Sequence, residues 1–242
     1  MKKNIEGVGE VMTPTTLKGK AQNFWYHYKW HSLLSIVVII AILVCSLQFC
    51  SKESYDSYIL YAGSKSISKT RTDGDVAEIE TVITSLKRIS EDFDGDGTNN
   101  VNFLNLQYMN AEEIAAAEGN VNDALLMSDQ STLASVLEHS EYYLCFISVS
   151  VYEDHHLVGT NELFIDLSEH KANYPDLEYY NGCAIYLSST GAYSLPGLSA
   201  LPEDTLICIR RPSVLGAKTD EHSELFDQAK EMLTNILKLK KV

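Results

Sequence analysis

The fold class follows from three successive segments: YILYAG (58–63), DVAEIETVITSLKRISEDF (75–93) and VNFLNLQYM (101–109). The first is a short apolar run that ends in glycine, which is typical of a buried strand. The second repeats apolar residues at a spacing of three and four, which predicts a helix with one buried face. The third is rich in β-forming residues and alternates in part, which predicts another strand.

The alternation of strands and helices continues to the end of the chain. We expect helices at AEEIAAAEG (111–119), STLASVLEH (131–139) and EHSELFDQAKEMLTNILKLKK (221–241), and strands at ALLMSD (124–129), YYLCFISVSVYE (142–153), ELFIDLSEH (162–170), GCAIYLSS (182–189) and DTLICIRRP (204–212). This order predicts an α/β domain with a mostly parallel sheet and helices on both faces. Cys145, Cys183 and Cys208 lie in the strand-like runs, and we interpret them as small buried residues.

One transmembrane helix is expected before this domain. LLSIVVIIAILVCSLQF (33–49) holds 17 residues without a charge, which is near the lower limit for a membrane span. Trp25, Tyr26, Tyr28 and Trp30 precede it, as aromatic residues do at a membrane interface. No small-x-small site follows the run, and neither Cys45 within it nor Cys50 just after it follows a small residue, which disfavours a cleaved or lipoprotein signal. We therefore expect an uncleaved signal anchor rather than a buried helix of a soluble domain.

The charge distribution predicts the orientation of this anchor. Residues 1–31 carry five lysines and two glutamates, a net charge of +3, so the total of −14 leaves −17 for the rest. Positive charge stays on the cytoplasmic side of a cell membrane. The expected order is a cytoplasmic tail (1–31), a transmembrane signal anchor (32–50), a stalk (51–57) and an extracytoplasmic domain (58–242). The acidic balance also argues against nucleic-acid binding, which needs a basic face.

Four segments of the expected domain carry a family resemblance. They are ALLMSD, FIDLSEH (164–170), GCAIYLSST (182–190) and DTLICIRRP with the final helix. In this order they resemble a strand, a D-L-S turn, the hinge segment and the return strand of the first lobe of extracellular solute-binding proteins of the type 2 periplasmic-binding class. In that family a second lobe follows the hinge segment and closes over the ligand. Here GAYSLPGLSALPED (191–204) stands in its place. The resemblance implies a truncated, one-lobed relative, such as an accessory of an envelope transporter or sensor.

The segment DFDGDGTNNVN (92–102) is a candidate calcium loop. The candidate ligands are Asp92, Asp94, Asp96, Thr98 and Asn100, which stand at positions 1, 3, 5, 7 and 9 of an EF-type loop. Position 6 is the required glycine, but position 12, which should be a glutamate, is Phe103. The pattern predicts a weak calcium site that needs a further ligand from elsewhere in the fold. The alternative is a helix-to-strand turn whose polar side chains bind local backbone groups.

Enzymatic chemistry has little support in the sequence. The motifs of serine hydrolases, P-loop NTPases and zinc proteases with H-E-x-x-H do not occur. His155 and His156 are ligand types for a metal, but neighbouring residues of a strand point to opposite faces. We expect Arg210 and Arg211 to pair with carboxylates. The sequence thus favours a non-enzymatic binding or interaction module, and the alternative is an extracytoplasmic hydrolase that uses carboxylates brought together by the fold.

Overall fold

The computed structural model describes residues 16–50, 55–67, 79–117, 119, 121–158, 161–212 and 220–240. The chain forms two units, Met1–Glu53 and Ser54–Val242. The first unit contains the helix α1 (Leu17–Cys50). The predicted helix over residues 75–93 appears as α2 (Ile79–Ile89), and the residues of that prediction before Ile79 lie outside the described residues.

The helix α1 is apolar on all sides along much of its length. Its large apolar side chains from Leu33 to Val44 are between 47% and 65% exposed. The stretch Tyr28–Ser46 is long and apolar enough to cross a membrane, by length and composition. The Ser46 hydroxyl donates a hydrogen bond to the Ile42 carbonyl (2.8 Å), so the helix satisfies this polar group internally. A helix with an apolar surface all round needs apolar surroundings.

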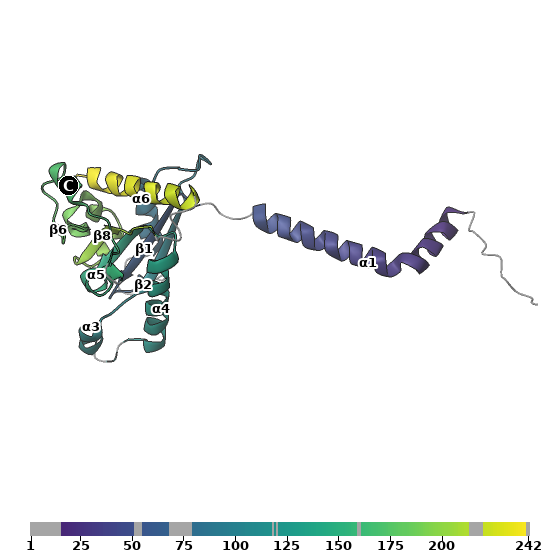
Figure 1. Cartoon of the computed structure of the whole chain (residues 1–242), viewed down its shortest axis with the longest axis horizontal. Helices are drawn as coiled ribbons and strands as arrows, with labels where there is room; N and C mark the ends of the chain where they lie inside the picture. The colour runs from purple at the N-terminus through teal and green to yellow at the C-terminus, as the bar shows by residue number, and fades with distance from the viewer. Residues whose placement is uncertain are drawn as a thin grey trace, which may run out of the picture. The chain divides into compact units, whose positions relative to one another are not determined.

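The second unit is an α/β domain with a mixed six-stranded sheet (Figure 1). Its strands are β1 (Ser57–Gly63), β2 (Val101–Gln107), β3 (Leu144–Ser148), β6 (Tyr179–Tyr180), β7 (Ala184–Tyr186) and β8 (Thr205–Ile209). They lie in the order β2–β1–β3–β8–β7–β6. A separate hairpin pairs β4 (Leu157–Val158) with β5 (Asn161–Glu162).

The expected parallel pairing holds in one half of the sheet only. The strand β1 pairs in parallel with both β2 and β3. The pairs β3–β8, β8–β7 and β7–β6 are antiparallel. For the pair β6–β7 the connection explains the direction, because Asn181 and Gly182 between these strands have positive φ angles of 47° and 74°. Such a short turn reverses the chain, whereas a parallel connection needs a crossover of a dozen or more residues.

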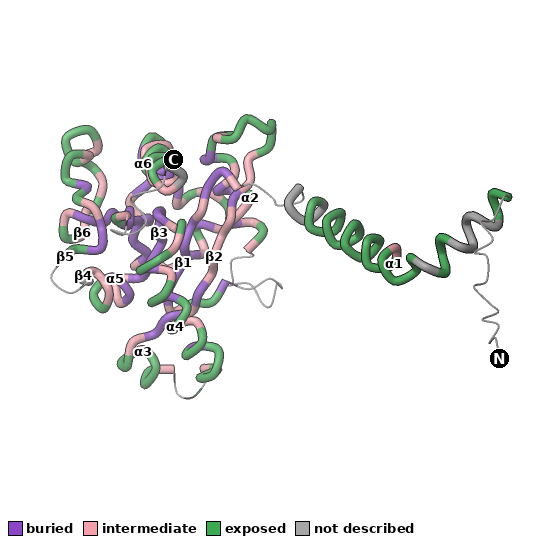
Figure 2. Tube along the Cα trace, turned by 45° about the vertical axis from the view of Figure 1, so that its right-hand side comes forward, coloured by how far each residue is buried: buried purple, intermediate pink, exposed green. Residues whose placement is uncertain are grey.

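Helices cover both faces of the sheet, as the sequence predicts. Besides α2, the helices of the domain are α3 (Ala111–Ala116), α4 (Asp123–His139), α5 (Val149–His155) and α6 (Asp220–Lys238), with the 3-10 turns η1 (Ser168–Ala172), η2 (Leu187–Ser189), η3 (Gly191–Ser194) and η4 (Leu198–Ala200). Ile59 and Tyr61 of β1 join the core with α2 and α6, and Leu60 and Ala62 join the core with α4 and α5. Figure 2 shows β1 and β3 as buried strands between these layers.

The prediction of a strand at ALLMSD is wrong, because these residues lie in α4. The Asn122 side chain accepts a hydrogen bond from the backbone N–H of Leu125 (3.2 Å) and caps the start of this helix. The buried residues of α4 are Leu126, Leu133 and Leu137, a spacing of seven and four that suits one helix face. The helix therefore extends through both ALLMSD and the predicted helix that follows it.

The long strand predicted at 142–153 is correct only in its first part. The strand β3 ends at Ser148, whose hydroxyl accepts a hydrogen bond from the N–H of Val151 (3.3 Å) and caps α5. In the predicted strand at 162–170, two residues have strand pairing: Glu162, which ends β5, and Phe164, which forms one isolated bridge with Arg210. In both places a polar side chain or turn ends the strand although the apolar pattern continues.

Candidate functional site

The acidic turn (residues 92–100) connects α2 to β2 at one edge of the sheet. The parallel register places Ser57 opposite Val101, so the residue before β1 lies beside the residue before β2. The backbone N–H of Asp56 donates to the carbonyl of Asn100 (2.8 Å). The turn is therefore attached to the first folded residues of the domain.

The carboxylate of Asp56 holds this turn in place. Its Oδ1 accepts hydrogen bonds from the N–H groups of Phe93 (2.8 Å) and Asp94 (3.2 Å), and its Oδ2 accepts one from Asn100 (2.7 Å). Asp56 is only 2% exposed. Asp56 and Ser57 thus belong to the folded domain, and residues 51–54 of the predicted stalk (51–57) lie outside the described residues.

Asp92, the first predicted calcium ligand, binds the backbone of its own turn. Its Oδ1 accepts hydrogen bonds from the N–H groups of Gly95 (2.7 Å) and Asp96 (3.1 Å), and its Oδ2 accepts one from Gly97 (2.8 Å). Gly95 and Gly97 have φ angles of 73° and 86°, which glycine adopts without strain. The glycines allow the backbone to curl around the carboxylate.

The remaining predicted ligands form smaller local turns. Asp94 Oδ1 accepts a hydrogen bond from the N–H of Asp96 (3.0 Å). Asp96 Oδ1 accepts from the N–H (2.7 Å) and the hydroxyl (2.6 Å) of Thr98, and the Asn100 amide donates to that hydroxyl oxygen (3.2 Å). These contacts are the local side-chain-to-backbone bonds of a polar turn.

The fold nevertheless brings three carboxylates together. One carboxylate oxygen from each of Asp56, Asp92 and Asp94 lies within 4.8 Å of the others, and Asp96 does not join this group. If the turn binds a cation, Asp56 is the residue from elsewhere in the chain that lies close enough to supply the further ligand. Three carboxylates suit a hard cation such as Ca²⁺. Their oxygens already accept several N–H groups, and the positive ends of these groups compete with a cation. Calcium binding stays a prediction.

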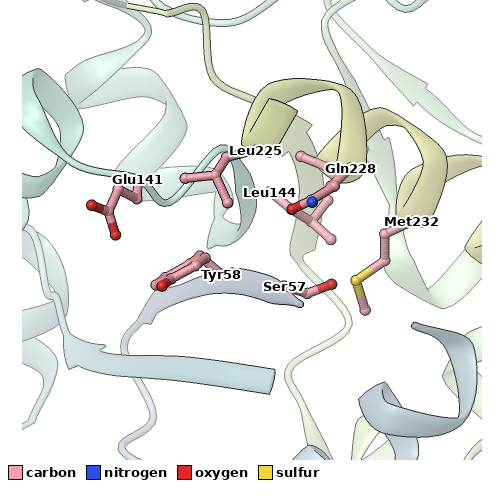
Figure 3. Close-up of a pocket in the computed structure, with 8 residues that line it drawn as sticks. Ser57, Tyr58, Glu141, Leu144, Leu225, Gln228 and Met232 are labelled. Atoms are coloured by element: carbon pink, nitrogen blue, oxygen red, sulfur yellow. The ribbon is translucent and has the colours of Figure 1, made fainter. Parts of the chain in front are cut away.

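Two cavities among the described residues differ in size. The smaller lies between β1, β3 and α6 and has a volume of about 10 Å³; Figure 3 shows Ser57, Leu144, Gln228 and Met232 around it. The buried Gln228 Oε1 has no hydrogen-bond partner among the described residues. This volume is roughly the minimum for one water molecule. It is far below the several hundred Å³ of a small-molecule site.

The larger cavity is an open groove of about 470 Å³ between η1 and α6. Its charged and titratable lining residues are Glu169, His170, Asp227, Lys230, Glu231 and Lys238. Lys230 pairs with Asp227 (2.5 Å), so part of the charge is neutralised within the groove. The groove has mixed polarity and is open to solvent rather than enclosed.

The histidine pair does not form a metal site in the described structure. His155 ends α5 and His156 follows it, so both lie at a helix end rather than in a strand. The ring of His156 stacks on Tyr152, with 5.4 Å between the ring centroids. The ring of His155 packs edge-on against Tyr108, also at 5.4 Å. The two rings therefore serve separate packing contacts.

The adjacent arginines have different partners. Arg211 pairs with Glu162 (3.3 Å), which confirms the expected ion pair. Arg210 is buried, and its expected pairing with a carboxylate is wrong, because its guanidinium donates to backbone carbonyls instead. Two of these carbonyls, of Leu137 and Ser140, lie at the end of α4, where a cation favours the negative end of the helix dipole.

Comparison with known protein families, with curated proteins and with solved structures finds no match.

Proposed function

We propose that this protein is a membrane-anchored binding or interaction module with its folded domain outside the cytoplasm. The observation that supports this proposal is the stretch Tyr28–Ser46 of α1, which is long and apolar enough to cross a membrane. The net charge of +3 in residues 1–31 favours a cytoplasmic N-terminus in the cell membrane. The acidic domain then lies on the opposite side of the membrane.

The roles of the acidic side chains favour an interaction module over the hydrolase. Among the described residues, Asp56, Asp92 and Asp94 form a group of three carboxylates that the fold brings together. Asp56 and Asp92 each accept three backbone N–H groups and so hold the turn between α2 and β2. A general acid or base must instead reach a substrate.

A relationship to solute-binding proteins is part of the same proposal. The order of β1, α2 and β2 supports it, as does the presence of helices on both faces of the sheet. The segment ALLMSD is helical, whereas the family segment that it was matched to is a strand, and this difference weakens the resemblance. A one-lobed domain would bind a partner on its surface, because the second lobe that encloses a solute is replaced by residues 191–204.

The experiment that tests this function separates the anchor from the domain. The full chain is cross-linked in its own membrane and purified, in parallel with a variant in which residues 28–46 are replaced by an unrelated apolar helix. We expect both chains to retain the same protein partner, because the domain carries the binding surface. Loss of that partner in the variant, or recovery of the wild-type chain alone, would contradict the proposal.

A further inference from the structure

Three cysteines at three neighbouring strands of the sheet lie in one part of its core. Cys145 is in β3, Cys208 is in β8, and Cys183 directly precedes β7. All three are buried free thiols, as the sequence predicts, and they belong to the same hydrophobic cluster. Two cysteines can bond covalently when the backbone holds them at a suitable separation, so the register of these strands determines whether any of the three can pair.

The register of β3 and β8 places Cys145 directly opposite Cys208. The backbone N–H of Arg210 donates to the carbonyl of Tyr143 (2.8 Å), which identifies these two opposite residues as a hydrogen-bonded pair. In an antiparallel ladder such pairs recur at every second residue, so Cys145 and Cys208 form the next one. The Cα atoms of a hydrogen-bonded pair are about 5.5 Å apart. Disulfides most often join Cα atoms that are separated by about 5.5–6 Å. The two strands therefore already have the spacing that a disulfide needs.

The side chains of this pair project from the same face of the sheet, because residues directly opposite each other on paired strands do so. The Cys145 thiol donates to the carbonyls of Tyr142 and Tyr143, at 3.7 Å each. A thiol is a weak donor, so these contacts offer little resistance to the rotation about χ1 that bond formation requires.

The third cysteine is less suited to pair with Cys208. The register of β7 places Ala184, and not Cys183, opposite Cys208. The thiol of Cys183 is also hydrogen-bonded to the Tyr152 side chain. The geometry of the sheet thus favours one pair out of the three cysteines.

We propose that Cys145 and Cys208 form a cross-strand disulfide when the domain folds in an oxidising compartment outside the cytoplasm. The compartment is the part of this inference that rests on the proposed function, because extracytoplasmic compartments permit disulfides and the cytosol keeps thiols reduced. The bond would join β3, which belongs to the parallel half of the sheet, to β8 of the antiparallel half.

The bond forms by two exchange steps with an external disulfide, R–S–S–R. The thiolate of one cysteine attacks a sulfur of R–S–S–R, which breaks that S–S bond, releases R–S⁻ and leaves a mixed disulfide on the chain. The thiolate of the second cysteine then attacks the chain sulfur, forms the Cys145–Cys208 bond and releases the second R–S⁻. The two cysteine protons end on the two released thiolates. The cysteine pair is thus oxidised by two electrons, and the external disulfide is reduced to two thiols.

Burial confines this reaction to the chain while it folds. Cys145 and Cys208 are both 0% exposed in the folded domain. Burial raises the pKa of the Cys145 thiol to about 12 and raises the pKa of Cys208 well above its ordinary value. Because the thiolate is the attacking species, the folded domain offers neither an accessible nor an ionised thiol at this pair. The same burial shields the finished bond from external thiols.

Oxidative refolding of the full chain tests the geometry. The chain is unfolded with urea and reductant in detergent micelles and refolded in reduced and oxidised glutathione, and circular dichroism confirms the native fold. It is then unfolded again, treated with a maleimide and digested for mass spectrometry. We expect a peptide pair linked through Cys145 and Cys208, with the maleimide on Cys183. The variant Cys183→Ala should keep the link. Free thiols at both 145 and 208, or a link between Cys183 and Cys208, would overturn the proposal.

Melting curves measure the effect of the bond on stability. A disulfide restricts the unfolded chain, so we expect the oxidised wild-type chain to melt about 10 °C above the reduced chain. The control carries both Cys145→Ala and Cys208→Ala and should have the same Tm in the two redox conditions. An equal Tm of the oxidised and reduced wild-type chains, or a redox-dependent Tm in the double variant, would overturn the proposal.

The thiol state in intact cells separates this inference from the proposed function. Cells that express the chain are quenched with acid to stop thiol exchange, and the same peptides are analysed after the maleimide treatment. We expect the Cys145–Cys208 link in cells, which would support both proposals. The link after refolding but free thiols in cells would retain the disulfide site and contradict folding of the domain in an oxidising compartment. Absence of the link in both samples would overturn this inference and leave the interaction module standing.

Discussion

The carboxylate of Asp56 accepts the backbone N–H of Asn100 at 2.7 Å, which joins the residue before β1 to the residue before β2. The same carboxylate accepts two further N–H groups of the acidic turn. Because the group is buried, its removal would leave these donors without a partner and without water. The carboxylate of Asp56 therefore holds together the chain segments that precede β1 and β2.

We therefore expect Asp56→Asn to lower the free energy of unfolding by on the order of 3 kcal/mol, since an amide replaces a charged acceptor of several hydrogen bonds. Urea unfolding of the full chain in detergent micelles measures this change. Asp176→Asn is the control, because Asp176 is exposed and its substitution should change the free energy by less than about 0.5 kcal/mol. Equal effects of the two substitutions would show that Asp56 does not hold the turn.

Melting curves in millimolar calcium and in chelator separate the two interpretations of the acidic turn. The hydrogen bonds of Asp92 and Asp94 to backbone N–H groups hold the turn without an ion, so we expect the same Tm in both conditions. A calcium-dependent rise in Tm that is absent in Asp94→Ala with Asp96→Ala would instead show a bound cation, because binding to the folded state alone raises Tm.

The adjacent arginines provide a matched pair of substitutions. Arg210 is buried, stacks its guanidinium over the Tyr143 ring at 4.7 Å and donates to carbonyls at the end of α4. We expect Arg210→Met to lower the free energy of unfolding by about 3 kcal/mol, because these carbonyls lose their donor. Arg211→Met removes a partly exposed ion pair and should lower it by at most about 1 kcal/mol. A larger effect at Arg211 in the urea titration would contradict this assignment.

Acidification should destabilise the domain in part through His155. Burial lowers the pKa of His155, although Asp154 opposes the shift, and its buried Nε2 has no partner among the described residues. Below the unfolded pKa of about 6.5 the unfolded chain binds a proton that the folded chain resists, so stability falls as the pH drops through that value toward the lowered folded pKa.

Unfolding titrations at neutral pH and near pH 5.5 measure this contribution. We expect the loss of stability between the two conditions to be smaller in His155→Gln than in the wild-type chain. His139→Gln changes an exposed histidine and should retain the wild-type loss. An unchanged loss in His155→Gln would show that this histidine does not contribute.

The sequence predicts the α/β class because apolar spacing reports local periodicity, which is visible in β1, α2, β2 and α6. It does not predict ALLMSD correctly, because a short apolar run is compatible with a strand or a helix. The spacing of Leu126, Leu133 and Leu137 and the capping residue Asn122 were the signals for one continuous helix. Leu125 and Met127 of this run are exposed, so its apolar residues do not mark a buried strand.

Asp56 illustrates a limit of local patterns. The loop spacing identified the acidic turn and the need for a ligand from elsewhere in the fold. The residue that approaches it lies 36 positions before Asp92 and reaches the turn only because β1 and β2 pair in parallel register. No local signal marks such a partner. The antiparallel half of the sheet was missed for a related reason, since pairing direction depends on the connections between strands.

With the N-terminus in the cytoplasm, the folded domain would be reached by protease added outside the cell. Intact cells that express the chain with an N-terminal tag are treated with protease, with and without permeabilisation. We predict that external protease removes the domain and leaves a tagged fragment that contains the cytoplasmic tail and α1, and that the tag is lost only after permeabilisation. Full protection of residues 54–242 in intact cells, with digestion after permeabilisation, would contradict the account.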